Sequence, residues 1–307
     1  SSNSCACRSF LLVLCRLPKH RRRAHAAAHH AARAFALHQL LHHLLHLLEI
    51  FEKTIDILHG RAATVRDAEA AAAVDNLRVA PLFLCHRADD RFRVLQFVFT
   101  PLSDTSPSAQ AYAERLNELL QVQGITSCVL VGHSLGALMG AAYAAGAGRH
   151  CVQRLLLISP AGGYGAADAA DKRERVRDER RGALRTLGVD GIAERIPARL
   201  LSDSASAADR AWVQWNASRL HAKGYLQAVE LLCNSDLGAC RPLDMPVAVY
   251  CGDADVVTPP AQCAAWAATL GAPFSLIPGA GHASPVQQPA AVARLVAAAV
   301  TGDTVHG

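Results

Sequence analysis

A serine between two glycines lies near the middle of this chain, in a setting that is typical of a nucleophile. Residues 132–136 read Gly-His-Ser-Leu-Gly. The apolar run 128–131 before them predicts a buried strand, and the small-residue run 135–147 predicts a helix. A Gly-x-Ser-x-Gly turn between a strand and a helix is the pattern of a nucleophile elbow, which presents a serine hydroxyl to a carbonyl carbon. Ser134 is therefore the candidate nucleophile.

The tightness of such a turn constrains the neighbours of Ser134. We expect Ser134 to have a strained backbone, and Gly132 and Gly136 to be needed because a Cβ at either position would collide with the neighbouring strand or helix. The start of the helix supplies backbone N–H donors, and the N–H of Leu135 is expected to point to where an oxyanion would form. His133 lies within the turn, where its side chain should pack beside the nucleophile instead of serving as its base.

A serine hydroxyl is a weak nucleophile near neutral pH, so Ser134 needs a base, and that base needs an acid to orient it. His282 follows the last predicted strand in a glycine-rich loop, which is the expected place for the base. Two acids, Asp253 and Asp255, follow the preceding predicted strand, in the usual chain order of serine, acid and histidine. Asp255 is favoured because it is the third residue after the glycine that ends its strand, and Asp253 remains the alternative.

An alternation of apolar strands and amphipathic helices must position these side chains. It predicts an α/β fold with a mostly parallel sheet and helices on both faces. Residues 166–241 lack a convincing strand, and their helices are expected to form a lid over the carboxyl edge of the sheet. Residues 76–165 and 242–302 then form the core. The predicted strands are 82–85, 92–100, 128–131, 152–158, 247–251 and 273–277, and the predicted helices are 109–123, 135–147, 168–187, 189–200, 205–220, 224–234, 260–270 and 286–300.

The composition is that of a globular protein of 307 residues, 51% of them hydrophobic and 19% charged. A chain of this length can bury a large core. No apolar run approaches the roughly 18 residues of a membrane span, so we expect no membrane partner. The ten cysteines are scattered without a C-x-x-C pair, which favours reduced thiols in a cytoplasmic protein over a disulfide framework.

Residues 1–75 differ in composition from the rest of the chain. Residues 1–60 hold eight Lys or Arg and three Asp or Glu, which accounts for the whole net charge of +5. We expect residues 1–75 to be a basic, His-rich extension that is helical or disordered. A metal and a nucleic acid are not expected as partners, because neither a histidine stripe nor a short arginine cluster completes a binding site. The stripe is His38, His42 and His46, and the cluster is Arg21, Arg22 and Arg23.

Three segments together resemble the signature regions of a known family. Residues 129–136, 252–259 and 281–282 match, in order, the elbow, the acid loop and the base histidine of the α/β-hydrolase superfamily. Residues 108–302 are therefore similar to this superfamily. The resemblance implies the α/β-hydrolase fold with a helical lid insertion, a catalytic triad, and no metal or cofactor. The implied triad is Ser134, His282 and Asp255.

A shorter similarity lies at the end of the predicted lid. Gly224-Tyr225, Asp236-Leu237 and the run that begins at Pro246 resemble the lid exit of 3-oxoadipate enol-lactonase-like hydrolases. This second resemblance implies that the substrate is a small lactone or ester that carries a carboxylate.

The first third of the chain departs from the superfamily pattern. In the superfamily an early strand ends in His-Gly, and the loop after that strand gives the second oxyanion N–H. Here His59-Gly60 lies too far upstream of the strand predicted to begin at Phe92, and Cys85-His86 lies too close to it for the usual intervening helix. Residues 1–107 are therefore expected not to match the family, and the second oxyanion donor is not recognisable.

The sequence thus predicts a serine hydrolase that cleaves a small-molecule carboxylic ester or lactone through an acyl-enzyme. The alternative is a hydrolase-like binding protein whose catalysis is impaired by the altered first third. Arginines crowd the first predicted lid helix, and one that turned inward could select a carboxylate, although a solvated face paired with neighbouring acids is favoured. These arginines are Arg173, Arg175, Arg177, Arg180, Arg181 and Arg185.

Overall fold

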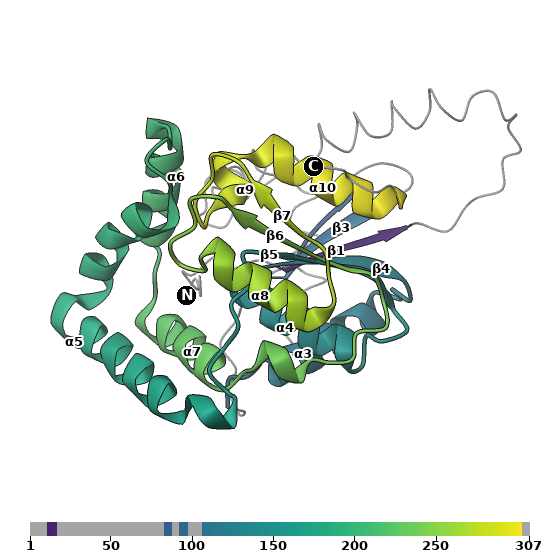
Figure 1. Ribbon diagram of the computed structural model, residues 1–307, viewed down its shortest axis with the longest axis horizontal. Helices are drawn as coiled ribbons and strands as arrows, with labels where there is room; N and C mark the ends of the chain where they lie inside the picture. The colour runs from purple at the N-terminus through teal and green to yellow at the C-terminus, as the bar shows by residue number, and fades with distance from the viewer. Residues whose placement is uncertain (1–10, 17–82, 88–91, 98–105, 303–307) are drawn as a thin grey trace, which may run out of the picture.

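The structure, a computed structural model, describes residues 11–16, 83–87, 92–97 and 106–302. Seven strands form one sheet in the order β2-β3-β1-β4-β5-β6-β7 (Figure 1). The strands are β1 Leu11–Arg16, β2 Phe83–Arg87, β3 Phe92–Phe97, β4 Cys128–His133, β5 Val152–Ile158, β6 Val247–Gly252 and β7 Phe274–Ile277. The helices are α3 Ala109–Val122, α4 Leu135–Ala145, α5 Ala170–Leu200, α6 Ala207–Ala217, α7 Ala222–Cys233, α8 Pro260–Leu270, α9 Ser284–Gln287 and α10 Pro289–Thr301, with short 3-10 turns η2 Ala167–Ala169 and η3 Leu237–Ala239.

The sheet is mostly parallel, as predicted. Strands β4, β5, β6 and β7 pair in parallel. Strand β1 is antiparallel to both β3 and β4, so β3 runs in the same direction as β4, and β2 runs opposite to β3. Five of the strands therefore share one direction. Each parallel neighbour is reached through a helical crossover, which is the connection that parallel pairing requires.

Strand β1 differs from the expectation for residues 1–75, which was a helical or disordered extension. Residues Leu11–Arg16 instead lie between β3 and β4 in the sheet. The physical reason is the apolar run itself, because a segment of this length that buries Val13, Leu14 and Cys15 satisfies its backbone by pairing on both sides. The histidine stripe His38 to His46 and the cluster Arg21 to Arg23 lie outside the described residues.

Helices cover both faces of the sheet, and the period of two along the strands explains how. On β4, Cys128 and Leu130 pack in one cluster with residues of α3, α4 and α8. Val129 and Val131 point to the other face and pack in a second cluster with residues of α10. Successive residues of a strand point to opposite faces, so an entirely apolar strand such as β4 is buried on both.

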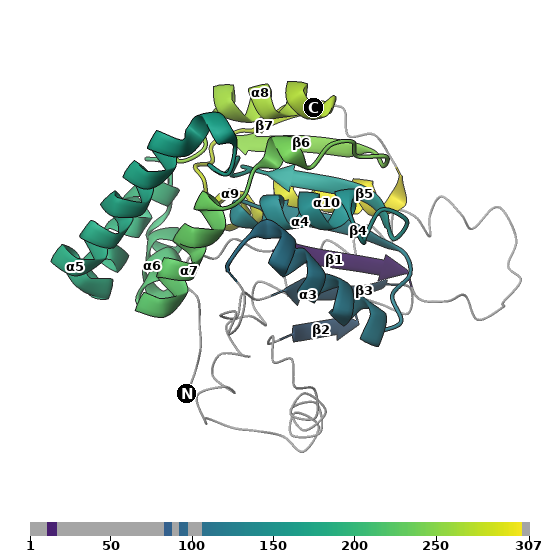
Figure 2. The same ribbon diagram turned by 90° about the horizontal axis from the view of Figure 1, so that it is seen from below.

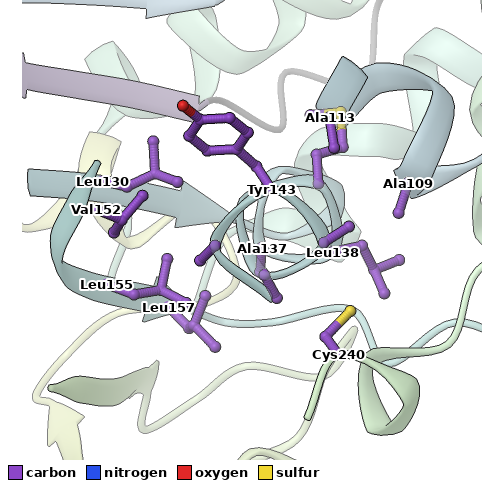
Figure 3. Packing of buried hydrophobic residues seen from close by; sticks show 14 of the residues in the cluster. Ala109, Ala113, Leu130, Ala137, Leu138, Tyr143, Val152, Leu155, Leu157 and Cys240 are labelled. Carbon is purple, nitrogen blue, oxygen red and sulfur yellow. The ribbon is translucent and has the colours of Figure 1, made fainter. Parts of the chain in front are cut away.

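Helix α4 lies close to the sheet because its contact face consists of small residues. Ala137, Ala141 and Ala144 are fully buried. Figure 3 shows Ala137 of this helix on the side of Leu155 and Leu157 of the sheet, whereas Leu138 lies on the side of Ala109 of α3. This close packing fixes the N-terminal end of α4, where residue 134 lies.

Helices α5, α6 and α7 stand apart from the two layers that cover the sheet. They lie at the end of the sheet toward which the arrow of β5 points (Figures 1 and 2). The break predicted between residues 187 and 189 is a kink at Gly188, whose φ is 65°. Val229 of α7 and Leu220, which precedes α7, belong to a small apolar cluster that α5 and α7 share. That residues 166–241 form a lid over the carboxyl edge of the sheet therefore stays a prediction, which the position of α5 to α7 supports.

Two further observations concern the composition of the described residues. None of their helices combines the length and the apolar character needed to span a bilayer. The cysteines whose state is described are free thiols. They are Cys15, Cys128, Cys151, Cys233, Cys240, Cys251 and Cys263.

Candidate active site

Three side chains from distant parts of the sequence meet at one edge of the sheet. Ser134 follows β4 directly, Asp255 lies three residues after β6, and His282 lies five residues after β7. These strands are parallel, so their carboxyl ends share one edge, and only β5 stands between β4 and β6. The topology alone therefore brings the serine, the acid and the histidine to a common place.

Hydrogen bonds connect the three side chains in series. The Ser134 hydroxyl oxygen is 2.9 Å from Nε2 of His282, and Nδ1 of His282 is 2.9 Å from Oδ2 of Asp255. A carboxylate only accepts hydrogen bonds, so Nδ1 carries the proton in this arrangement. Nε2 is then left with its lone pair toward the serine hydroxyl, which is the arrangement a general base needs.

Asp255 is buried and held by several donors. The backbone N–H groups of Val257 and Thr258 donate to its Oδ1 at 2.8 and 3.0 Å, and the Thr258 hydroxyl donates to its Oδ2 at 2.9 Å. Burial alone raises the pKa of the Asp255 carboxyl, but the hydrogen bond and charge of His282 and the Thr258 N–H outweigh burial and lower the pKa to about 2. The side chain is therefore ionised at neutral pH.

This lowered pKa predicts a dependence of stability on pH. Because the folded pKa of Asp255 lies below the ordinary value, ionised Asp255 stabilises the fold above about pH 4 by about 2 kcal/mol, and this contribution is lost as the pH falls to about 2. Urea unfolding of the wild type and of Asp255→Asn from pH 6 to pH 2 measures it. The difference in unfolding free energy between the two proteins should shrink as the pH falls, and a constant difference would contradict the prediction.

Asp253, the alternative acid, occupies a different place. Its Oδ1 accepts from the backbone N–H of Ala280 at 3.2 Å, and the residue is exposed. This contact ties two loops together at the sheet edge. The structure therefore places the Asp255 carboxylate, and not that of Asp253, against His282.

The backbone of Ser134 has the strained geometry expected of an elbow. Its φ is 55° and its ψ is −117°, a combination that non-glycine residues rarely adopt. An ideal Cβ built on Gly132 would lie 2.6 Å from the carbonyl oxygen of Gly136 and 2.7 Å from the Cα of Ala137. Strand and helix thus approach each other at Gly132 too closely for any side chain. Gly136 is buried in the first turn of α4.

Gly132→Ala should therefore be severely destabilising. The added methyl group meets backbone atoms, which cannot move without displacing α4, and we expect a loss of at least about 3 kcal/mol in unfolding free energy. Thermal unfolding of the purified variants measures the loss. Gly182→Ala is the matched control, because its Cβ would lie 4.0 Å from the nearest atom, on α5. A Gly132→Ala protein as stable as the control would contradict this packing.

His133 contacts the loop of residues 278–283, which carries His282 and is called the histidine loop below, as its place beside the nucleophile predicts. Its Nε2 lies 2.8 Å from the backbone carbonyl oxygen of His282 and therefore donates to it. The two imidazole rings have centroids 5.0 Å apart. His133 thus braces the backbone of His282 and does not reach the Ser134 hydroxyl in place of His282.

The oxyanion donors are only partly described. Leu135 begins α4, so its backbone N–H lies in the first turn, directly after Ser134. Of the two places where a second donor was sought, His59-Gly60 lies outside the described residues. The other, Cys85-His86, lies in β2, and the four residues that follow β2 are not described. The Leu135 donor consequently stays a prediction.

Two residues near the site were missed by sequence reasoning. Thr258 donates its hydroxyl to Asp255, and its oxygen also lies 3.3 Å from Nδ1 of His282. Gln287 accepts a hydrogen bond from the backbone N–H of Gly281, directly before His282. The position of Thr258 in the acid loop was the only signal for it, and for Gln287 the sequence carries none, because its contacts are set by the packing of distant segments.

Three of the arginines of α5 are engaged in polar contacts with neighbouring residues. Arg177 pairs with Glu174 and with Glu230, at 3.1 Å for the latter, and Arg181 reaches Glu230 at 2.9 Å. Arg173 donates to the carbonyl oxygen of Tyr164 at 3.2 Å. These contacts agree with the favoured interpretation of a charged face. Within the described ranges, no group of three or more His, Cys, Asp or Glu side chains is placed to hold a metal ion.

Comparisons with known proteins agree with this architecture. A family model described as alpha/beta hydrolase family matches residues 57–295, and so includes residues 57–107, which we expected to fall outside the family pattern. No curated protein matches the chain.

Several solved structures share the fold. An esterase from Thermogutta terrifontis is 23% identical, with a TM-score of 0.57 over 68% of this chain and 80% of that one. An enol-lactonase from Burkholderia xenovorans is 22% identical, with a TM-score of 0.58 over 69% and 82%. A bromoperoxidase from Bacillus anthracis is 15% identical, with a TM-score of 0.59 over 68% and 82%. At these identities the likeness concerns the fold alone.

Proposed function

Because this chain belongs to the alpha/beta hydrolase family, we propose that it is a serine hydrolase that cleaves a small-molecule carboxylic ester or lactone. The observation that carries the proposal is the continuous series of hydrogen bonds from the Ser134 hydroxyl through His282 to Asp255, each 2.9 Å long. Its members are a nucleophile, a base and an acid, in the geometry that acyl transfer needs.

In the proposed reaction the Ser134 oxygen attacks the substrate carbonyl carbon while its proton passes to Nε2 of His282. The imidazolium that forms is stabilised by the Asp255 carboxylate at Nδ1. The tetrahedral oxyanion accepts a hydrogen bond from the Leu135 N–H. When the intermediate collapses, the bond between the carbonyl carbon and the alcohol oxygen breaks, and that oxygen takes the proton from Nε2. The alcohol then leaves, or, where the substrate is a lactone, the ring opens and the alcohol stays attached through the acyl chain.

Water then completes the cycle. His282 takes a proton from a water molecule, whose oxygen attacks the acyl-enzyme carbonyl carbon. The second tetrahedral intermediate expels the Ser134 oxygen, which recovers its proton from Nε2. The products are a carboxylic acid and an alcohol, or a hydroxy acid from a lactone. The bonds and protons of these steps balance with Ser134, His282 and one water molecule.

The substrate class rests on two supports. Esterases and an enol-lactonase are among the proteins that share the fold. Helices α5 to α7 lie beside the carboxyl ends of the strands, where they would enclose a small substrate (Figure 1). The engaged state of Arg173, Arg177 and Arg181 gives no support for selection of a carboxylate by these side chains, so we propose a simple ester or lactone.

Labelling with a fluorophosphonate tests the proposal. This reagent phosphonylates an activated serine, so the wild type should take up one equivalent and peptide mapping should place it on Ser134. A panel of p-nitrophenyl esters and small lactones, with Ser134→Ala as the control, then identifies the bond that is cleaved. A wild type that is neither labelled nor active would instead support a catalytically impaired hydrolase-like binding protein.

A further inference from the structure

The side chain of Gln287 joins two segments that are far apart in the sequence. Its Oε1 accepts from the backbone N–H of Ser202 at 3.0 Å and from the backbone N–H of Gly281 at 2.8 Å. Its Nε2 donates to the Ser202 hydroxyl at 2.7 Å. Ser202 lies just after α5, and Gly281 directly precedes His282. Both polar atoms of the amide are thus used to hold the end of α5 against the histidine loop.

The two segments also contact each other directly. The backbone N–H of Ala283 donates to the carbonyl oxygen of Leu200 at 2.8 Å. The hydroxyl of Ser204 donates to the carbonyl oxygen of Gly279 at 3.3 Å. An ideal Cβ on Gly281 would lie 2.8 Å from the carbonyl oxygen of Leu200, so the backbones themselves are packed together. The exit of α5, meaning residues 200–204, therefore packs directly against the histidine loop.

This loop needs such support because its own sequence does not fix its shape. Gly279 has a φ of 71°, and Gly281 follows two residues later, so the chain before His282 is intrinsically permissive. Asp255 holds Nδ1 of His282, and His133 holds its backbone carbonyl. On the N-terminal side of His282, the hydrogen bond from the Gly281 N–H to Gln287 holds the backbone that leads into His282.

We propose that Gln287 is a positioning residue for His282, which it orients by tying the histidine loop to the exit of α5. This inference rests on the proposed function, because His282 is the base only in that reaction. Gln287 is not placed against the reacting atoms, so its effect passes through the orientation of His282. A displacement of the α5 exit would be transmitted through the same amide to the base.

Three variants test this role. Gln287→Met keeps the length of the side chain but neither accepts nor donates strongly, and Gln287→Glu keeps an acceptor for both backbone N–H groups. Gln123→Met makes the same chemical change at an exposed residue that follows α3, and no described contact joins its side chain to either segment. The number of active sites in each protein is counted by fluorophosphonate titration, and kcat and KM for a p-nitrophenyl ester are expressed per titrated site.

A misplaced base slows the chemical step and leaves substrate binding largely intact. We expect Gln287→Met to lower kcat per site about 10- to 100-fold with KM within about threefold, and Gln287→Glu to stay within about threefold of the wild type. Hydrogen exchange of the backbone amides of residues 202 and 281 should be faster in Gln287→Met. Gln123→Met should match the wild type in all these measurements.

The outcomes separate this inference from the proposed function. A Gln287→Met protein that loses stability or titratable sites but keeps the wild-type kcat per site would show a merely structural role and overturn the inference. Unchanged amide exchange at residues 202 and 281 would overturn it as well. A wild type that is neither labelled nor active would remove the hydrolase itself, and with it the role of Gln287, before any variant is made.

Discussion

Ser134→Ala should lower kcat for ester hydrolysis by about 10⁶-fold, the order of the loss when the serine of a catalytic triad is removed. The reason is that the imidazole 2.9 Å away loses the atom it activates, and no covalent intermediate can form. Stopped-assay kinetics with a p-nitrophenyl ester at high protein concentration measure the residual rate. The variant should also fail to react with a fluorophosphonate.

Ser284→Ala is the matched control for this substitution. Ser284 is fully buried and lies two residues after His282, and its hydroxyl makes no hydrogen bond with the described residues. Loss of that hydroxyl should therefore leave kcat within about threefold of the wild type. A Ser134→Ala protein with more than about one thousandth of the wild-type kcat would show that another residue supplies the nucleophile.

The elements around the candidate site could be predicted because their signals are local. The run Val152–Ile158 is an apolar segment of strand length between polar turns, and the strand has those bounds in the structure. Helix α8 begins at Pro260, a residue favoured in the first turn of a helix, and ends before Gly271, whose φ is 65°. Segments with such boundary signals can be predicted without knowledge of the rest of the fold.

Strand β1 could not be predicted in the same way. Its six residues carry an apolar signal, but nothing in them indicates a partner. The partners are β3 and β4, which both lie far away in the sequence. The surrounding residues are basic and rich in histidine, and this composition predicted an extension instead of a strand of the sheet. Pairing between distant segments depends on tertiary packing, which local patterns do not encode.

The site shows the same division between local and distant information. Ser134, Asp255 and His282 each follow a strand in a recognisable loop, so they could be predicted as candidates from the sequence. The topology of the sheet then brings them together. Gln287 is the last residue of the short helix α9, between His282 and α10, and has no motif of its own. Its three hydrogen bonds reach Ser202 and Gly281, and they exist only because the end of α5 packs against the histidine loop.

Asp255→Asn should lower kcat by about 10⁴-fold, which is the effect of the same change in a triad of this kind. Asn presents an acceptor to the N–H groups of Val257 and Thr258, so its NH₂ group faces Nδ1 of His282. A donor at that position stabilises the tautomer with its proton on Nε2, which can no longer accept the proton of Ser134. KM should change little, because the carboxylate does not face the substrate.

Asp253→Asn is the control that decides between the two acids of the loop. Asp253 accepts one backbone hydrogen bond, from Ala280, which an asparagine oxygen accepts equally well, so kcat should stay within about threefold of the wild type. Both variants are assayed per fluorophosphonate-titrated site across pH 6 to 9. A large loss in Asp253→Asn with retained activity in Asp255→Asn would assign the orienting acid to the other carboxylate. In that case the hydrogen bond seen between Asp255 and His282 would not be the one used in turnover.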